Sequence, residues 1–93
     1  KMVKFEWDSH KEAINIKKHG VSFNQAKEAL ACRLVIVLRE DEDHDEPRYV
    51  FLGMCKKLNL LVVVVAYPDE KVIRIVSARK ATKKERLFYE TQL

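Results

Sequence analysis

The sequence predicts a single α+β domain, in which helices pack on one mostly antiparallel sheet with the element order β-α-α-β-β-β-β-α. Two observations lead to this fold class. Helix-start signatures precede and follow a series of short apolar runs, and the later runs are joined by links so short that their strands must be antiparallel neighbours. The 93 residues are predicted to form one domain over 2–93, with Lys1 taken as an expression remnant.

The helix starts share one spacing, in which Ser or Thr is followed three residues later by Glu or Gln. This capping box occurs at residues 9–12, 22–25 and 82–85, with Asp8 as a competing cap for the first helix. The first helix is expected to end near His19, because Gly20 favours the left-handed conformation that follows many helices. The second helix is expected to run from Phe23 to about Cys32.

The strands are predicted from alternating or continuously apolar segments, at 3–7, 34–38, 49–55, 60–67 and 72–78. The segment 60–67 contains four consecutive valines, which indicates a central strand covered on both faces. Gly53 lies inside a predicted strand. A glycine in that position indicates either a bulge or the close approach of another backbone.

Charge is unevenly distributed along the chain. There are 18 basic and 14 acidic residues, a net charge of +4, but six of the acids lie within residues 40–46. This acidic stretch is predicted to be a loop that either folds over a basic site or remains a solvated linker. The rest of the chain is strongly basic, which favours an anionic partner.

Composition argues against several other classes. Cys32 and Cys55 lack the spacing of a metal site and are expected to be buried free thiols. The acidic stretch lacks the glycine and the final glutamate of a calcium loop, and the chain has only two glycines, so neither a metal nor a cofactor is predicted. The longest apolar run is too short to span a bilayer and no signal peptide is visible, which predicts a cytoplasmic protein with no membrane contact.

Basic residues gather where the last strand meets the last helix. Such a density of cations at the end of an element favours RNA or DNA as the partner. Arg74 has two interpretations, as a structural pair of a carboxylate or as a phosphate ligand. Arg79 is favoured as a site residue, because it is expected at a junction that is rigid yet open to solvent. The cluster comprises Arg74, Arg79, Lys80, Lys83, Lys84 and Arg86.

Four residues are candidates for moving protons, and each has a structural alternative. His19 lies where the end of a helix favours a cation, and His44 lies in the acidic stretch, where carboxylates would raise its pKa. Glu85 fits the capping box, which is its preferred interpretation. Tyr89 lies four residues farther along the same helix and would either pack on the sheet or stack on a base.

Taken together, these residues resemble the BrnT toxins of bacterial type II toxin–antitoxin systems over nearly the whole chain. The sequence departs from the family's usual pattern at Cys32 and Arg33, which replace an Asp-Pro pair, and at Pro47, which separates a Glu-Arg pair. The resemblance rests on Phe5-Glu-Trp-Asp8 with Lys11, Asn15, Lys18-His-Gly-Val-Ser-Phe23, the acidic stretch with His44, Glu46 and Arg48, Gly53, Arg74-Ile-Val-Ser-Ala-Arg79, Ala81-Thr82, Glu85-Arg86 and Tyr89.

The resemblance to BrnT implies a RelE-like α+β fold and a ribonuclease that arrests translation. It also implies a BrnA-like antitoxin with a DNA-binding ribbon-helix-helix part. Toxin and antitoxin would form a heterotetramer, in which the antitoxin supplies the dimer contact. Operator DNA would be bound only through the antitoxin.

The resulting hypothesis is metal-independent cleavage of RNA, in which a ribose 2′-hydroxyl attacks the adjacent phosphorus. Arg74 and Arg79 would stabilise the developing charge, and His19, Glu85 and Tyr89 are the further catalytic candidates. The alternative is a non-catalytic module that uses the same basic face to bind nucleic acid or an acidic protein segment. The basic residues expected to hold flanking phosphates are Lys18, Arg48, Lys80, Lys83 and Arg86.

Overall fold

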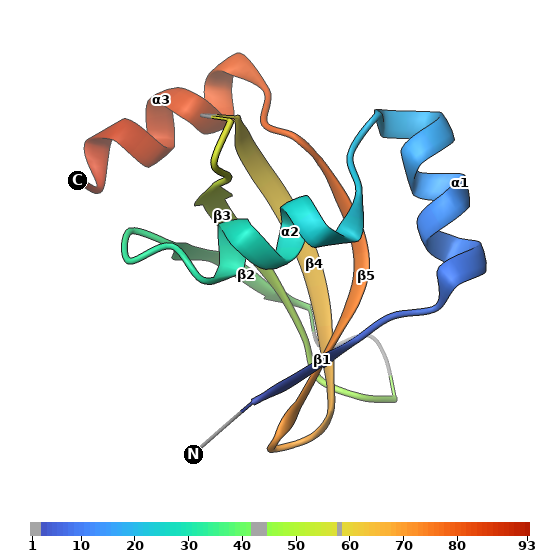
Figure 1. Cartoon of the computed structure of the whole chain (residues 1–93). Helices are drawn as coiled ribbons and strands as arrows, with labels where there is room; N and C mark the ends of the chain where they lie inside the picture. Colours follow the sequence, from blue (N-terminus) through green and yellow to red (C-terminus); the bar gives the residue numbers. More distant parts are fainter. Residues whose placement is uncertain (1–2, 42–44, 58) are drawn as a thin grey trace.

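A five-stranded sheet forms the centre of the protein in the computed structural model, which describes residues 3–41, 45–57 and 59–93 (Figure 1). The strand order is β1-β5-β4-β3-β2; the β1–β5 pair is parallel and the other pairs are antiparallel. This arrangement confirms the predicted α+β class and element order. The elements are β1 (Lys4–Glu6), α1 (Ser9–His19), α2 (Phe23–Leu30), β2 (Ile36–Asp41), β3 (Arg48–Met54), β4 (Leu60–Asp69), β5 (Val72–Lys80) and α3 (Lys83–Thr91).

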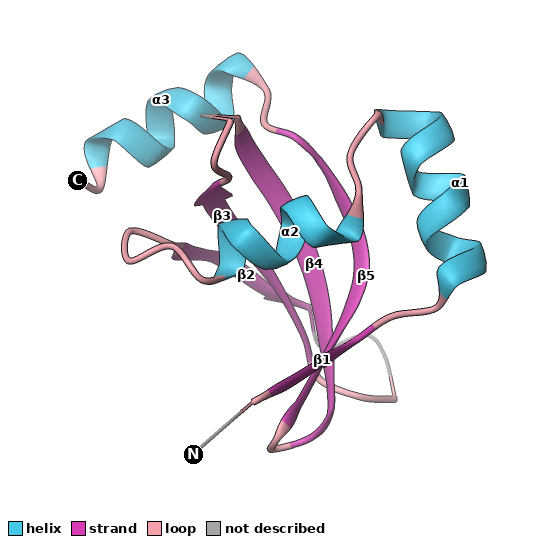
Figure 2. Ribbon diagram, in the orientation of Figure 1, coloured by secondary structure: helices cyan, strands magenta, loops and turns pink. Residues whose placement is uncertain are grey.

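The two faces of the sheet carry separate hydrophobic clusters. On one face α2 packs Phe23 and Ala29 into a cluster that includes Val63 of β4. On the other face α3 packs Tyr89 into a cluster that includes Val62. Figure 2 shows α2 lying across the sheet and α3 near one of its ends. We call the side of the sheet that packs against α2 the α2 face, and the side that packs against α3 the α3 face. Because β4 is the middle strand and sends buried side chains to both faces, it is the central strand that the sequence predicts.

Two of the predicted capping boxes form with both of their hydrogen bonds. At α2 the Ser22 hydroxyl accepts from the amide of Gln25 at 3.1 Å, and the Gln25 side chain accepts from the amide of Ser22 at 2.9 Å. At α3 the same exchange joins Thr82 and Glu85, at 3.1 and 2.8 Å. These helix starts are therefore fixed by residues close together in the chain.

The first helix uses Asp8 as its cap and not the predicted capping box at Ser9. The Asp8 carboxylate accepts hydrogen bonds from two amides of the first turn at 2.8 and 3.2 Å. Glu12, which the capping box would have used, instead accepts from the backbone N–H of Phe23 at 2.8 Å. A carboxylate on α1 thus satisfies an amide that the start of α2 leaves open, and it links the two helices.

The strands near the acidic stretch extend farther than predicted. β2 begins at Ile36 and reaches Asp41, so that the first two acidic residues belong to a strand, and β5 continues to Lys80. Asp41 lies opposite Arg48 in the β2–β3 ladder. Charged side chains are tolerated there because β2 lies at one edge of the described sheet. By contrast, α2 is shorter than predicted, because it ends at Leu30 and not near Cys32.

Gly53 marks a close approach and not a bulge. The β3–β4 ladder continues without interruption through Gly53 and Leu61. A Cβ atom at Gly53 would collide with the backbone carbonyl of Ala29 in α2. The glycine therefore lets α2 lie directly on β3, which is one of the two alternatives that the sequence leaves open.

A buried asparagine holds α1 at the edge of the sheet. β1 pairs with β5 only as far as Arg74, so the later part of β5 has no described strand on that side. Asn15 takes the place of a strand, because its side-chain oxygen accepts from the N–H of Ala78 at 3.2 Å and its NH₂ donates to the carbonyl of Ala78 at 2.8 Å. The same NH₂ donates to the carbonyl of Val21 at 2.9 Å. α1 therefore lies beside β5 (Figure 1).

Both cysteines are free thiols, as the sequence predicts. Cys55 is buried, whereas Cys32 is only half-buried, so the expected burial holds for one of the two. Over the described parts of the chain, no helix is long and apolar enough to cross a membrane.

Candidate functional site

Three arginines lie on the α3 face of the sheet. Arg48 and Arg74 are both paired with Ala66, from opposite sides, while Arg79 is paired with Val62. Paired residues on neighbouring strands extend their side chains to the same side of a sheet. The strand spacing puts Arg48 and Arg74 about 10 Å apart, and the rise along β4 puts Arg74 and Arg79 about 13 Å apart. We call the surface carrying Arg48, Arg74, Ser77 and Arg79 the arginine face.

Arg74 is held by two carboxylates. Its Nε donates to Glu6 at 2.8 Å and its Nη1 donates to Glu46 at 3.0 Å. The hydrogen bond to Glu6 raises the pKa of Arg74, and the nearby charge of Glu46 acts in the same direction. Arg74 is therefore the structural pair of a carboxylate that the sequence offers as one interpretation. Its side chain still keeps 43% of its surface exposed, so the pairing leaves room for the other interpretation, a phosphate ligand.

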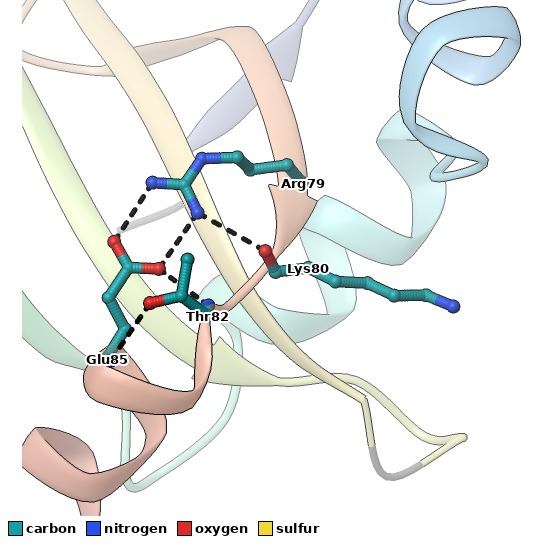
Figure 3. Close-up of polar contacts among 4 residues, drawn as sticks. All are labelled: Arg79, Lys80, Thr82 and Glu85. Carbon is teal, nitrogen blue, oxygen red and sulfur yellow. Dashed lines mark hydrogen bonds and ion pairs between the residues drawn. The ribbon is translucent and has the colours of Figure 1, made fainter.

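Arg79 makes a two-pronged ion pair with Glu85 across the junction between β5 and α3 (Figure 3). Nη1 and Nη2 donate to the two carboxylate oxygens at 2.8 and 2.9 Å, and Nη1 also donates to the carbonyl of Lys80 at 3.2 Å. One of these carboxylate oxygens also accepts from the amide of Thr82. Glu85 therefore serves as the predicted helix cap and also fixes the orientation of the guanidinium.

The ion pair changes the acidity of Glu85. The hydrogen bond from Arg79 is the main cause that lowers the pKa of Glu85 to about 2, and the amide of Thr82 lowers it further. Only 18% of the Glu85 side chain is exposed, compared with 36% for Arg79. At neutral pH Glu85 is thus a fixed anion and a weak proton acceptor.

One edge of the Arg79 guanidinium remains open. A guanidinium has five N–H donors, of which Arg79 uses three in the contacts described above. Nε and the second hydrogen of Nη2 have no protein acceptor among the residues that the structure describes. These donors lie on the same side of the planar group, which is the geometry that binds two phosphate oxygens at once.

Arg48 adds a donor that lacks a partner. Its Nε is buried and has no hydrogen-bond partner within the described ranges. A buried N–H without an acceptor is unfavourable by about 1–3 kcal/mol.

The other predicted site residues are distributed around this face. Lys18 is exposed and His19 half-buried, and both line a small depression between α1 and β5. His44 lies outside the described residues. The remaining predicted phosphate ligands are exposed at the end of β5 and the start of α3; they are Lys80, Lys83 and Arg86.

Tyr89 is part of the core. It is 3% exposed within the cluster on the α3 face, and its hydroxyl donates to the carbonyl of Leu34 at 3.0 Å. Burial is the main cause that raises its pKa. The geometry favours the packing interpretation over stacking on a base.

The sequence did not predict the acidic partners of Arg74. Glu6 and Glu46 are 68 and 28 positions away, and Glu6 reaches Arg74 only because β1 and β5 pair in parallel. One signal was available, since Glu6 alternates with apolar residues in its strand and had to lie on the polar side of it. In the described portions of the chain, no group of three or more His, Cys, Asp or Glu side chains is arranged to hold a metal ion.

Comparison with known protein families gives the class of the protein. The sequence model for the ribonuclease toxin BrnT of type II toxin–antitoxin systems matches residues 7–85, which is most of the chain. The class that this match defines is the ribonuclease toxins of type II toxin–antitoxin systems. The chain is a member of the BrnT family.

A solved structure has the same fold. The crystal structure of the Brucella abortus ribonuclease toxin BrnT superposes with a TM-score of 0.69 at 24% sequence identity, over 88% of this chain and 100% of that chain. The similarity extends over the predicted α+β architecture and confirms it. Among curated proteins, no significant match is found.

Proposed function

We propose that this protein is a metal-independent endoribonuclease that cleaves RNA and thereby arrests translation. The observation that carries the proposal is the guanidinium of Arg79, which Glu85 holds in place while one edge stays free for a phosphate. Arg74 lies on the same face of β5 and is also accessible. Two fixed cations on one surface are suited to a phosphate that gains negative charge during its reaction.

In the proposed reaction, the 2′-oxygen of a ribose attacks the neighbouring phosphorus. The bond from O2′ to phosphorus forms while the bond from phosphorus to O5′ breaks, which leaves a cyclic phosphate and a 5′-hydroxyl. One proton leaves O2′ and another is delivered to O5′. Arg79 and Arg74 stabilise the charge on the phosphorane oxygens. Flanking phosphates are held by Lys18, Arg48, Lys80, Lys83 and Arg86.

The geometry divides the proposed acid–base candidates. Glu85, with a pKa of about 2, acts by positioning Arg79. Tyr89 acts through packing, because its hydroxyl is committed to Leu34 in the core. His19 is half-buried in the depression beside Ser77, and imidazole is the side chain that enzymes use most often to transfer protons. We assign proton transfer to His19.

A protein antitoxin completes the proposed system. Membership in a type II family implies that the partner is a protein, and the proposed partner is BrnA-like, with a ribbon-helix-helix part that joins two toxin–antitoxin pairs into a heterotetramer. Operator DNA is contacted only through the antitoxin. The proposed site of action is the cytoplasm, where the RNA substrate is found.

The second candidate is a non-catalytic module that binds RNA, DNA or an acidic protein segment. The exposed cations where β5 passes into α3 favour it, because Lys80, Lys83 and Arg86 can hold phosphates whether or not a bond is broken. A face of this kind can bind a polyanion without breaking it. The two candidates predict different products, so cleavage distinguishes them.

The test compares purified parent protein with Arg79→Ala and with Arg33→Ala, which removes an exposed arginine from the turn after α2. When they are expressed in cells without the antitoxin, the parent and Arg33→Ala should arrest growth. As purified proteins, both should cleave RNA in EDTA. Arg79→Ala should lose about 10²–10³-fold in cleavage rate, as expected when a well-aimed stabilising donor is removed. Cleavage abolished by EDTA would refute metal independence, and RNA binding without cleavage, with and without ribosomes, would support the binding module.

A further inference from the structure

A groove runs between α1 and the edge of β5 that β1 leaves open. Its larger part, about 410 Å³, lies against Arg74 and the start of α1. Its smaller part, about 210 Å³, lies against the second half of α1 and Ser77. Lys11 and Val76 line both parts, so the two parts adjoin along α1, and the larger one reaches Arg74.

The smaller part of the groove is lined by cations and not by carboxylates. Lys11, Lys18 and His19 contribute basic side chains, and Ser77 contributes a hydroxyl. The larger part also carries two acids, Glu6, which pairs with Arg74, and Asp8, which caps α1. The positive charge available to a ligand therefore lies in the smaller part, on Lys11 and Lys18.

The cations stand on one side of a fixed helix. Lys11 and Lys18 are separated by seven residues, which places them on the same helix face about 10 Å apart along the axis. Asn15 lies between them on that face and is locked to Ala78 of β5 by hydrogen bonds of 2.8 and 3.2 Å. Ile14, 53% exposed, adds an apolar contact beside the lysines. The spacing of the charges is thus set by the fold.

We propose that this groove binds the stretch of single-stranded RNA next to the phosphate that is cleaved on the arginine face. Lys11 and Lys18 each contact one phosphate of that strand, Ser77 donates to a phosphate or ribose oxygen, and Ile14 lies against a base. The groove leads the strand to Arg74. The inference rests on the proposed ribonuclease function, for which it names the path of the substrate.

The experiment measures binding separately from cleavage. The probe is a short single-stranded RNA with 2′-O-methyl groups throughout, which removes the nucleophile that the proposed reaction needs. Binding is followed by fluorescence anisotropy between 50 and 200 mM salt for the parent, for Lys11→Gln/Lys18→Gln and for Lys56→Gln/Lys57→Gln. The last variant removes the same charge from exposed positions in the turn between β3 and β4. Circular dichroism confirms that all three are folded.

If the groove binds RNA, Lys11→Gln/Lys18→Gln weakens binding roughly tenfold at low salt and reduces the slope of log affinity against log salt by about 1.4, since each single-strand phosphate contact contributes about 0.7. Lys56→Gln/Lys57→Gln changes both values much less. Equal effects of the two variants would overturn the groove, because only net charge would then matter. Cleavage of unmodified RNA by the parent is measured in parallel; its absence would refute the ribonuclease proposal and leave the binding comparison intact.

Discussion

The Arg79 guanidinium donates hydrogen bonds to both carboxylate oxygens of Glu85, at 2.8 and 2.9 Å, where β5 passes into α3. The contact joins the last strand to the last helix and at the same time orients a cation on the open part of the α3 face. Figure 3 shows the same carboxylate bonded to the amide of Thr82. A single side chain thus ties the helix start to the chemistry of the site, so changes at Glu85 should affect stability and activity together.

Glu85→Gln tests the contribution of this ion pair to stability. Gln can still complete the capping box but cannot pair as an anion with Arg79, so the free energy of unfolding at pH 7 should fall by about 1–2 kcal/mol, a value reduced because Arg79 is partly exposed. Urea unfolding followed by circular dichroism measures it. Glu90→Gln, an exposed change on the same helix, is the control and should have little effect.

The same variant should change the response to acid. The pKa of Glu85 is lowered from 4.5 to about 2 in the folded protein, so its stabilising contribution is complete above about pH 5 and is lost as the pH falls from about 4.5 to 2. Over that interval the difference in unfolding free energy between the parent and Glu85→Gln should shrink. A constant difference from pH 7 to 2 would contradict the ion pair as the cause.

Arg79→Lys tests whether geometry or charge matters at the arginine face. Lysine keeps the positive charge, but it lacks the planar edge that can hold two phosphate oxygens while the other donors stay on Glu85. The cleavage rate at saturating RNA should therefore fall by about 10²-fold, although the protein remains folded. Arg33→Lys provides the matched control. Full activity in Arg79→Lys would show that a point charge is sufficient there.

Local contacts were predictable, and distant pairings were not. The capping boxes at Ser22 and Thr82 follow from residues three positions apart, which is why the sequence identifies them directly. The partnership of Arg74 with Glu6 depends on the parallel β1–β5 pair, and no local pattern specifies that pairing. The exchange of Ser9 for Asp8 as a cap has a physical cause as well, since a carboxylate accepts two amide hydrogens at once and leaves Glu12 free to bind the start of α2.

Gly53→Ala should destabilise the fold by about 1–3 kcal/mol, because the new methyl group would meet the backbone carbonyl of Ala29 and a packed helix cannot move without disturbing its neighbours. Gly20→Ala is an informative comparison. At Gly20 nothing lies within 4 Å of the added atom, and the penalty comes from φ of +70° alone, about 1 kcal/mol. Thermal unfolding of both variants measures the difference. If Gly53→Ala is no worse than Gly20→Ala, α2 does not lie as close to β3 as described.

Asn15→Ala should release α1 from the edge of the sheet. The change leaves the N–H and carbonyl of Ala78 without their partner, which lowers the free energy of unfolding by about 1–3 kcal/mol. Hydrogen exchange should be faster at the amide of Ala78 than in the parent, whereas the central β4 amides should change only through the global loss of stability. Asn24→Ala, at an exposed position of α2, is the control. Because β5 also carries Arg74 and Arg79, loosening this edge should lower RNA cleavage in proportion to the lost protection at Ala78. Unchanged exchange at that amide would mean that α1 is held by other contacts and that Asn15 does not act as a substitute strand.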